Sequence, residues 1–169
     1  MSSEGTKPLT CFILVINLLM YAIVLALAAW ALNYGINETP EAVKGLSVPA
    51  KIFPIYYPIG NLATGFFVIL SLLAGLVGIA SSFSGLYDVL EWKPSSLLSA
   101  AASSLTAWAL TLLAMGLACK EISIGDRPAS LRAMETLMII LSGTQLLCIG
   151  TIHAGVSATN DSARHSEGV

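Results

Sequence analysis

Charged residues are scarce in this chain of 169 residues, since only 11% of them are Asp, Glu, Lys or Arg and the formal net charge is −2. A balance this close to neutral provides no basic surface for nucleic acid. The chain has three cysteines and two histidines. No loop carries a pair of cysteines, which excludes a disulfide framework, and the isolated histidines have no ligands at metal-binding spacing.

Enzyme motifs are also absent from the sequence. It contains no CxxC, HExxH, GxSxG or phosphate-loop pattern, and no polar segment long enough to build a soluble active site. We therefore expect a protein that is not an enzyme and that holds neither a metal ion nor a cofactor.

Long apolar runs dominate what is present, because 56% of the residues are hydrophobic. Each of four runs is at least 22 residues long, and 22 helical residues span about 33 Å, enough to cross the apolar core of a bilayer. We predict an all-α fold, an integral membrane bundle of four transmembrane helices. Residues 1–154 would form a single membrane domain, with helices at about 9–32, 59–82, 97–118 and 131–152. The polar tail 155–169 is expected to be disordered.

The orientation in the membrane rests on conflicting signals. An even number of helices places both termini on one side. The Lys and Arg count favours the loops 33–58 and 120–130 in the cytosol. Against this stands the glycosylation sequon at Asn37, although Asn160 begins a second sequon on the opposite side. Small four-helix plasma membrane proteins usually keep both termini in the cytosol, and we expect that orientation here.

Small residues and two cysteines mark further features of the predicted helices. Ala74, Gly78 and Ser82 recur at a spacing of four, which lets helices approach closely in lipid and would also allow copies of the chain to associate. Cys11 and Cys119 lie next to the membrane surface, where S-acylation is possible. The alternative, that they are small hydrophobic side chains in contact with protein or lipid, stays open.

Polar and aromatic residues within the apolar runs are the candidates for a binding site, because ionisable groups in a membrane are costly to bury. The candidates are Asn17, Tyr21, Asn61, Thr64, Trp108, Lys120, Arg132, Glu135 and Gln145. Each also has a structural interpretation. The charged residues would anchor the predicted helix hairpin at the interface, the amides would hydrogen-bond between helices, and the tryptophan would fill space.

Two long motifs and a set of shorter ones resemble a known plant family. The first motif, residues 53–67, reads FPIYYPIGNLATGFF, and the second, residues 107–122, reads AWALTLLAMGLACKEI. Residues 131–135, 144–147 and 152–153 are similar to the family's fourth helix. On these residues the chain resembles the AWPM-like family, the abscisic-acid-induced wheat plasma membrane polypeptides, over nearly all of residues 9–154.

The resemblance implies a multi-pass plant plasma membrane protein connected with abscisic acid, seed maturation, and drought or freezing tolerance. It also implies a function, because uptake of abscisic acid has been proposed for members of the family. A carrier for this amphipathic weak acid needs a polar site for the carboxylate and an apolar wall for the ring.

The candidate residues can be assigned to such a carrier. Lys120 or Arg132 would meet the carboxylate, and Asn61 or Gln145 would orient it. Tyr21 and Trp108 would line the ring, and protonation of Glu135 would couple transport to a proton gradient. The alternative function is a structural protein that organises the membrane during dehydration without transporting anything. It is favoured by the small number of helices and the sparse polar residues.

Overall fold

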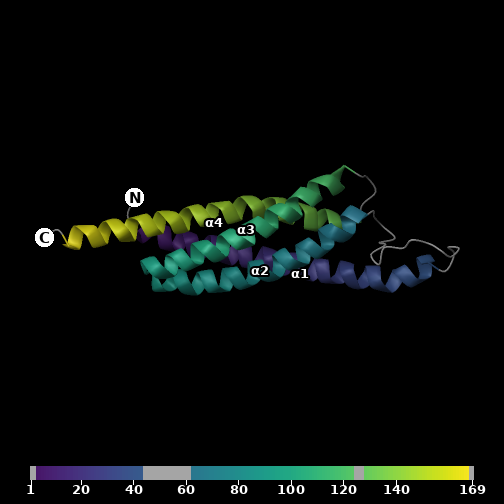
Figure 1. Ribbon diagram of the computed structural model, residues 1–169, viewed down its shortest axis with the longest axis horizontal. Helices are drawn as coiled ribbons and strands as arrows, with labels where there is room; N and C mark the ends of the chain where they lie inside the picture. Colours follow the sequence, from purple (N-terminus) through teal and green to yellow (C-terminus); the bar gives the residue numbers. More distant parts are fainter. Residues whose placement is uncertain (1–2, 44–61, 124–127, 168–169) are drawn as a thin grey trace.

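The computed structural model describes residues 3–43, 62–123 and 128–167. These residues form four helices, α1 (Ser3–Val43), α2 (Leu62–Glu91), α3 (Pro94–Ile122) and α4 (Ala129–Glu167) (Figure 1). Each contains a stretch long and apolar enough to cross a membrane. The prediction of an all-α fold with four membrane-spanning helices is confirmed.

The helices pack in a ring in which chain neighbours lie side by side. α1 contacts α2 and α4, α3 contacts α2 and α4, and α1 faces α3 across the bundle. Successive helices run in opposite directions, so the start of α1 and the end of α4 lie at the same end of the molecule (Figure 1). We call this the termini end. The opposite end, formed by the starts of α2 and α4 and the end of α3, is called the loop end.

Close packing between α1 and α2 depends on glycine. A Cβ atom on Gly75 would stand 3.2 Å from the Leu25 Cα atom, so the two backbones are close at this point. A Cβ atom on Gly78 would stand only 2.5 Å from the Cε1 atom of Tyr21, because the tyrosine ring lies directly over this glycine. Ala74 and Ser82 are also buried, so the predicted small-residue stripe of α2 packs inside the bundle.

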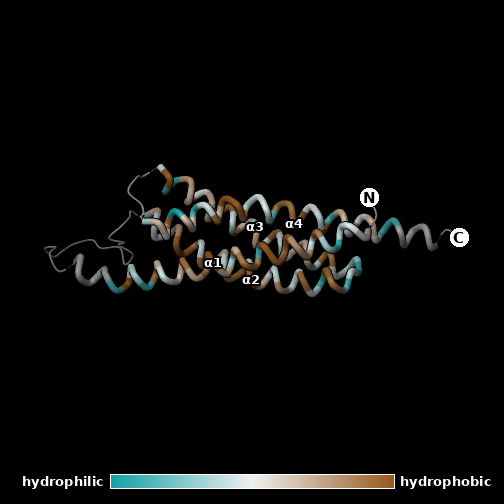
Figure 2. Tube along the Cα trace, turned by 180° about the vertical axis from the view of Figure 1, so that it is seen from behind, coloured by the Kyte–Doolittle hydropathy of each residue, from teal (hydrophilic) through white to brown (hydrophobic). Residues whose placement is uncertain are grey.

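The outer surface of the bundle is strongly apolar. Large hydrophobic side chains such as Phe12, Leu76 and Leu147 are about 60% exposed, in every helix and not in one patch. Figure 2 shows hydrophobic residues along the bundle and more hydrophilic segments towards the helix ends. A water-soluble bundle would place polar residues on this surface, whereas a bilayer requires apolar ones.

The helices extend beyond the apolar runs, and several predicted boundaries are corrected. α1 continues to Val43, so the first part of the expected loop 33–58 is helical, and α4 continues to Glu167 where a disordered tail was expected. Hydropathy marks only the part of a helix that contacts lipid. The backbone remains helical beyond it until a residue stops the helix. The later part of the expected first loop lies outside the described residues.

The connection between α2 and α3 is much tighter than the predicted loop 83–96. Only Trp92 and Lys93 separate the two helices, and Pro94 occupies the first turn of α3, where its missing N–H group costs nothing. Trp92 adopts a left-handed backbone conformation with φ of 51°. Such a conformation is unfavourable for a residue with a side chain, so contacts of the indole ring must hold it in place.

Candidate functional site

The middle of the bundle contains a buried polar pair between helices. Asn17 of α1 donates a hydrogen bond from Nδ2 to the Oε1 atom of Gln145 in α4, at 2.7 Å. Gln145 in turn donates from Nε2 to the backbone carbonyl of Ser104 in α3, at 3.3 Å. Both amide side chains are fully buried. The predicted alternative of interhelical hydrogen bonding therefore describes their contacts.

One helical turn further along α1, a second polar pair crosses the bundle. The hydroxyl groups of Tyr21 and Thr111 lie 2.8 Å apart, and Thr111 also hydrogen-bonds to the carbonyl of Ala107 in its own helix. Because the backbones of α1 and α3 lie on opposite sides of the bundle, this side-chain contact spans its interior. It fills the space between the two helices.

Trp108 precedes Thr111 by three residues in α3 and makes a hydrogen bond of its own. Its indole Nε1 donates to the backbone carbonyl of Ser142 at 3.0 Å, which joins α3 to α4. Tyr21 is bonded across the bundle and Trp108 at the α3–α4 seam, so the polar group of each ring has a partner in the protein. The wall of Tyr21 and Trp108 around a ligand ring stays a prediction.

The loop end contains a third buried polar contact, which lies beside a cavity. Thr64 in the first turn of α2 donates a hydrogen bond from Oγ1 to the Oε2 atom of Glu121 in the last turn of α3, at 2.8 Å. The Glu121 side chain is 2% exposed and that of Thr64 is 1% exposed. A carboxyl group is thus held inside the bundle by a hydroxyl group from the neighbouring helix.

Thr64 also lines a cavity of about 230 Å³, which we call the end pocket. Trp30 and Tyr34 of α1 form one aromatic wall, since their rings are stacked with centroids 5.6 Å apart. Ala31 of α1 and residues near the starts of α2 and α4 complete the described lining. The described lining residues are Trp30, Ala31, Tyr34, Thr64, Val68, Pro128, Ser130 and Leu131. The pocket combines an apolar, aromatic wall with the aliphatic hydroxyl groups of Thr64 and Ser130.

The start of α4 contributes to this pocket in a second way. Pro128 precedes the helix, and Arg132 N–H makes the first backbone hydrogen bond, to the Pro128 carbonyl at 3.2 Å. The backbone N–H groups of the first turn of a helix point away from the helix and favour an anion. Ser130 and Leu131, which line the pocket, lie in this first turn.

The charged candidates at the loop end fall into two groups. Lys120 and Arg132 are exposed, whereas Glu135 is 2% exposed. The spacing of Arg132 and Glu135 is typical of an ion pair within a helix. Asn61, the remaining candidate, lies outside the described residues. Of the predicted residues that the structure describes, Thr64 alone lines the end pocket.

Sequence reasoning missed Glu121 and the aromatic wall. A signal for Glu121 was present, because Ala107, Thr111, Ala114 and Ala118 are all buried and the 4–3–4 spacing of this stripe continues to position 121. Lys120, next to Glu121, instead indicated that the end of this apolar run lies at the membrane interface. Trp30 and Tyr34 share one face of α1 four residues apart, but their spacing does not reveal the cavity beside them.

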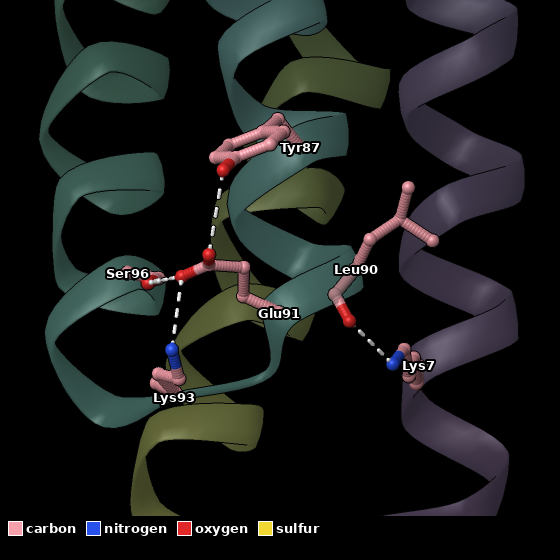
Figure 3. Close-up of polar contacts among 6 residues, drawn as sticks. All are labelled: Lys7, Tyr87, Leu90, Glu91, Lys93 and Ser96. Carbon is pink, nitrogen blue, oxygen red and sulfur yellow. Dashed lines mark hydrogen bonds and ion pairs between the residues drawn. The ribbon is translucent and has the colours of Figure 1, made fainter.

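The termini end is held together by a different set of polar contacts (Figure 3). Lys7 of α1 donates to the carbonyl of Leu90 at 2.8 Å, where a cation stabilises the end of α2. Glu91 accepts hydrogen bonds from Ser96 at 2.9 Å and Tyr87 at 3.4 Å, and pairs with Lys93 at 3.6 Å.

The Trp92 ring is the centre of the packing at this end. It lies 5.8 Å from the Lys7 ammonium group and in contact with the position of Gly155 in α4. These groups surround the ring from two helices. These contacts join α1, the α2–α3 connection and α4 at the termini end.

Metal-binding and cysteine chemistry have little support in the described part of the chain. No group of three His, Cys, Asp or Glu side chains there is placed to hold a metal ion. Cys11, Cys119 and Cys148 are all free, with Cys119 exposed and Cys148 buried. A further groove of about 550 Å³ runs between α1 and α4 near the termini, lined by glycine, alanine, leucine and threonine. None of its described lining residues carries an ionisable side chain.

The apolar exterior, the four spanning helices and the buried polar contacts together define a four-helix integral membrane protein. The model of the AWPM-19-like family matches residues 15–155, and the chain belongs to this family. It is similar to "Membrane protein PM19L" of Oryza sativa subsp. japonica, with 44% identity over 153 residues, which cover 89% of this chain and 80% of the rice protein. No solved structure matches the chain.

Proposed function

We propose that this protein facilitates the uptake of abscisic acid, an amphipathic weak acid, across the plant plasma membrane. The observation that carries the proposal is the end pocket, which joins an aromatic wall to hydroxyl groups beside a buried carboxyl group. Family membership and the similarity to a rice membrane protein support the plant and membrane setting.

The pocket offers complementary groups for both halves of such a ligand. The stacked rings of Trp30 and Tyr34 present an apolar surface for a carbon ring. Thr64, Ser130 and the first turn of α4 present hydrogen-bond donors for a carboxylate. Exposed Lys120 and Arg132 would attract an anion to this end and so raise its local concentration. We propose this role for them in place of the direct contact with the carboxylate that the sequence led us to expect.

Orientation follows as part of the same proposal. With both termini in the cytosol, the end pocket faces the outside of the cell, where an uptake protein receives its substrate. The Asn37 sequon would then lie outside as well. S-acylation of exposed Cys119 would require the opposite orientation, so the two modifications are alternatives in this account.

The alternative function, a membrane-organising protein of the dehydration response, is favoured by the closed interior of the bundle. The Asn17–Gln145 and Tyr21–Thr111 contacts occupy the space that a continuous polar path would need. An uptake protein must therefore rearrange these contacts or move the substrate along the bundle surface. Association of copies, where it occurs, would use exposed Gly143 and Gly150 of α4, because the α2 stripe is buried.

Uptake into proteoliposomes tests the proposal against this alternative. Radiolabelled abscisic acid is added outside vesicles that contain the purified protein, with an imposed pH gradient and protein-free vesicles as the passive background. We expect saturable uptake above that background, reduced by Thr64→Val and unchanged by Glu91→Gln at the termini end. Uptake equal to that of protein-free vesicles, from protein shown to be folded, would favour the membrane-organising function.

A further inference from the structure

Glu121 is a buried carboxyl group with one oxygen left open. Its Oε2 atom accepts the hydrogen bond from Thr64, whereas Oε1 has no hydrogen-bond partner among the described residues. Buried polar atoms are nearly always satisfied, so an open oxygen at 2% exposure requires an explanation. Because the Glu121 side chain makes no other hydrogen bond to a described residue, its contact with Thr64 can reverse direction when the carboxyl group gains a proton.

Glu121 and a ligand in the end pocket would compete for the single O–H group of Thr64. A hydroxyl group has a single O–H to donate and two lone pairs that accept. In the structure this donor is used by Glu121, while the Thr64 side chain also lines the end pocket. While Glu121 is ionised, Thr64 therefore cannot donate to a ligand in the pocket.

Protonation of Glu121 would reverse this hydrogen bond. The carboxylic acid O–H then donates to Thr64 Oγ1, and the Thr64 O–H becomes free to donate to a carboxylate in the pocket. Ionised Glu121 and a bound carboxylate would also repel each other across the shared threonine, and protonation removes that repulsion. Both effects link binding of an anion to the gain of one proton.

We propose that Glu121 is the proton acceptor that couples occupancy of the end pocket to proton uptake, with Thr64 as the relay between them. One proton passes from water at the loop end to Glu121 for each carboxylate bound. This assignment rests on the proposed function, because it requires a carboxylate ligand in the pocket. It differs from the sequence-based expectation, which gave the coupling role to Glu135.

The described part of the loop end carries other ionisable groups. On α4, Glu135 is buried and Arg132 exposed, on α3 Lys120 is exposed, and on α1 Tyr34 lines the pocket. The part of α2 near the pocket carries no charged side chain. Glu121 is distinguished by its direct hydrogen bond to a residue that lines the pocket.

Proton uptake on binding can be counted by calorimetry. Abscisic acid is titrated into the purified full-length protein in detergent, in buffers of different ionisation enthalpy, at several values between about pH 5.5 and 9, where a free carboxyl group is ionised. The dependence of the heat on the buffer gives the protons taken up by the protein. Wild type is expected to gain about one proton per molecule bound within this range.

Variants locate the proton. Glu121→Gln, which imitates the neutral acid, is expected to bind abscisic acid without proton uptake and without the pH dependence of wild type. Thr64→Val removes the hydroxyl group between Glu121 and the pocket, and this variant is expected to bind abscisic acid weakly with no proton uptake. Thr64→Ser keeps the hydroxyl group and should keep both the binding and the proton uptake. Glu91→Gln at the termini end should match wild type.

Three outcomes would overturn the assignment. If wild type binds with no proton uptake at any pH, or Glu121→Gln gains as many protons as wild type, Glu121 is not the acceptor. If Glu135→Gln abolishes the uptake while Glu121→Gln does not, the role belongs to Glu135. If wild type binds no abscisic acid, the proposed function fails and this inference fails with it.

Discussion

The contact between Tyr21 and Gly78 allows a quantitative test of the packing. In Gly78→Ala the new Cβ atom would lie 2.5 Å from Cε1 of the Tyr21 ring. Carbon atoms pack best at about 3.5–4.0 Å, so the ring or the helix must shift by about 1 Å. Tyr21 is fully buried and bonded to Thr111, so a shift also disturbs that hydrogen bond. Overpacking of this kind costs about 1–3 kcal/mol.

Gly143 provides a matched control on the lipid-facing surface. A Cβ atom there meets no atom within 4 Å. Replacing glycine by alanine within a helix is favourable by about 1 kcal/mol, a gain common to both variants. The difference in stability between Gly143→Ala and Gly78→Ala therefore isolates the clash, and we expect Gly78→Ala to be less stable by about 1–3 kcal/mol.

Unfolding by SDS in mixed micelles, followed by circular dichroism, measures this difference. The double variant Gly78→Ala with Tyr21→Ala removes the ring that causes the clash, so the two substitutions should be non-additive, with the pair less destabilising than the sum. Equal stability of Gly78→Ala and Gly143→Ala would refute the described packing of α1 on α2.

Three further predictions concern other parts of the bundle. Asn17→Ala and Gln145→Ala should each destabilise the protein, and a double-mutant cycle should give a coupling of about 0.6–1.7 kcal/mol, whereas zero coupling would contradict the buried pair. Trp92→Ala should lower stability to SDS by about 0.5–3 kcal/mol, because the partly buried ring packs against α1 and α4, and Lys7→Ala should cost about 0.5–1 kcal/mol. Unchanged stability of Trp92→Ala would exclude its role at the termini end. Trp30→Ala should reduce uptake of abscisic acid into proteoliposomes without loss of folded protein, and uptake at the wild-type rate would exclude the aromatic wall as a binding surface.

The presence and number of the helices follow from the sequence because long apolar runs have few alternatives in a bilayer. The ends of the helices do not follow from the sequence. In α4 the apolar run ends at about position 152, but the helix continues through polar residues to Glu167, where hydropathy gives no signal. The start of α3 was signalled by Pro94, whose restriction of the backbone is local.

The candidate site was predictable only in part. Thr64 and Glu135 were predicted as binding-site candidates because they are polar residues within apolar segments, and both are buried. Asn17 and Gln145 are 128 residues apart, and nothing local in the sequence reveals that they bind each other. The end pocket depends on the relative placement of α1, α2 and α4, which helical periodicity does not determine.

Equilibrium binding tests most directly whether the end pocket holds a weak-acid carboxylate. Tritiated abscisic acid is titrated onto purified wild-type protein and Thr64→Val by scintillation proximity, with Thr64→Ser as the matched control. A hydrogen bond to a charged group contributes about 1.5–3 kcal/mol, so the account predicts saturable binding to wild type and Thr64→Ser, weakened about 10- to 150-fold in Thr64→Val. Equal affinity of wild type and Thr64→Val, or no saturable binding to folded wild type, would contradict it.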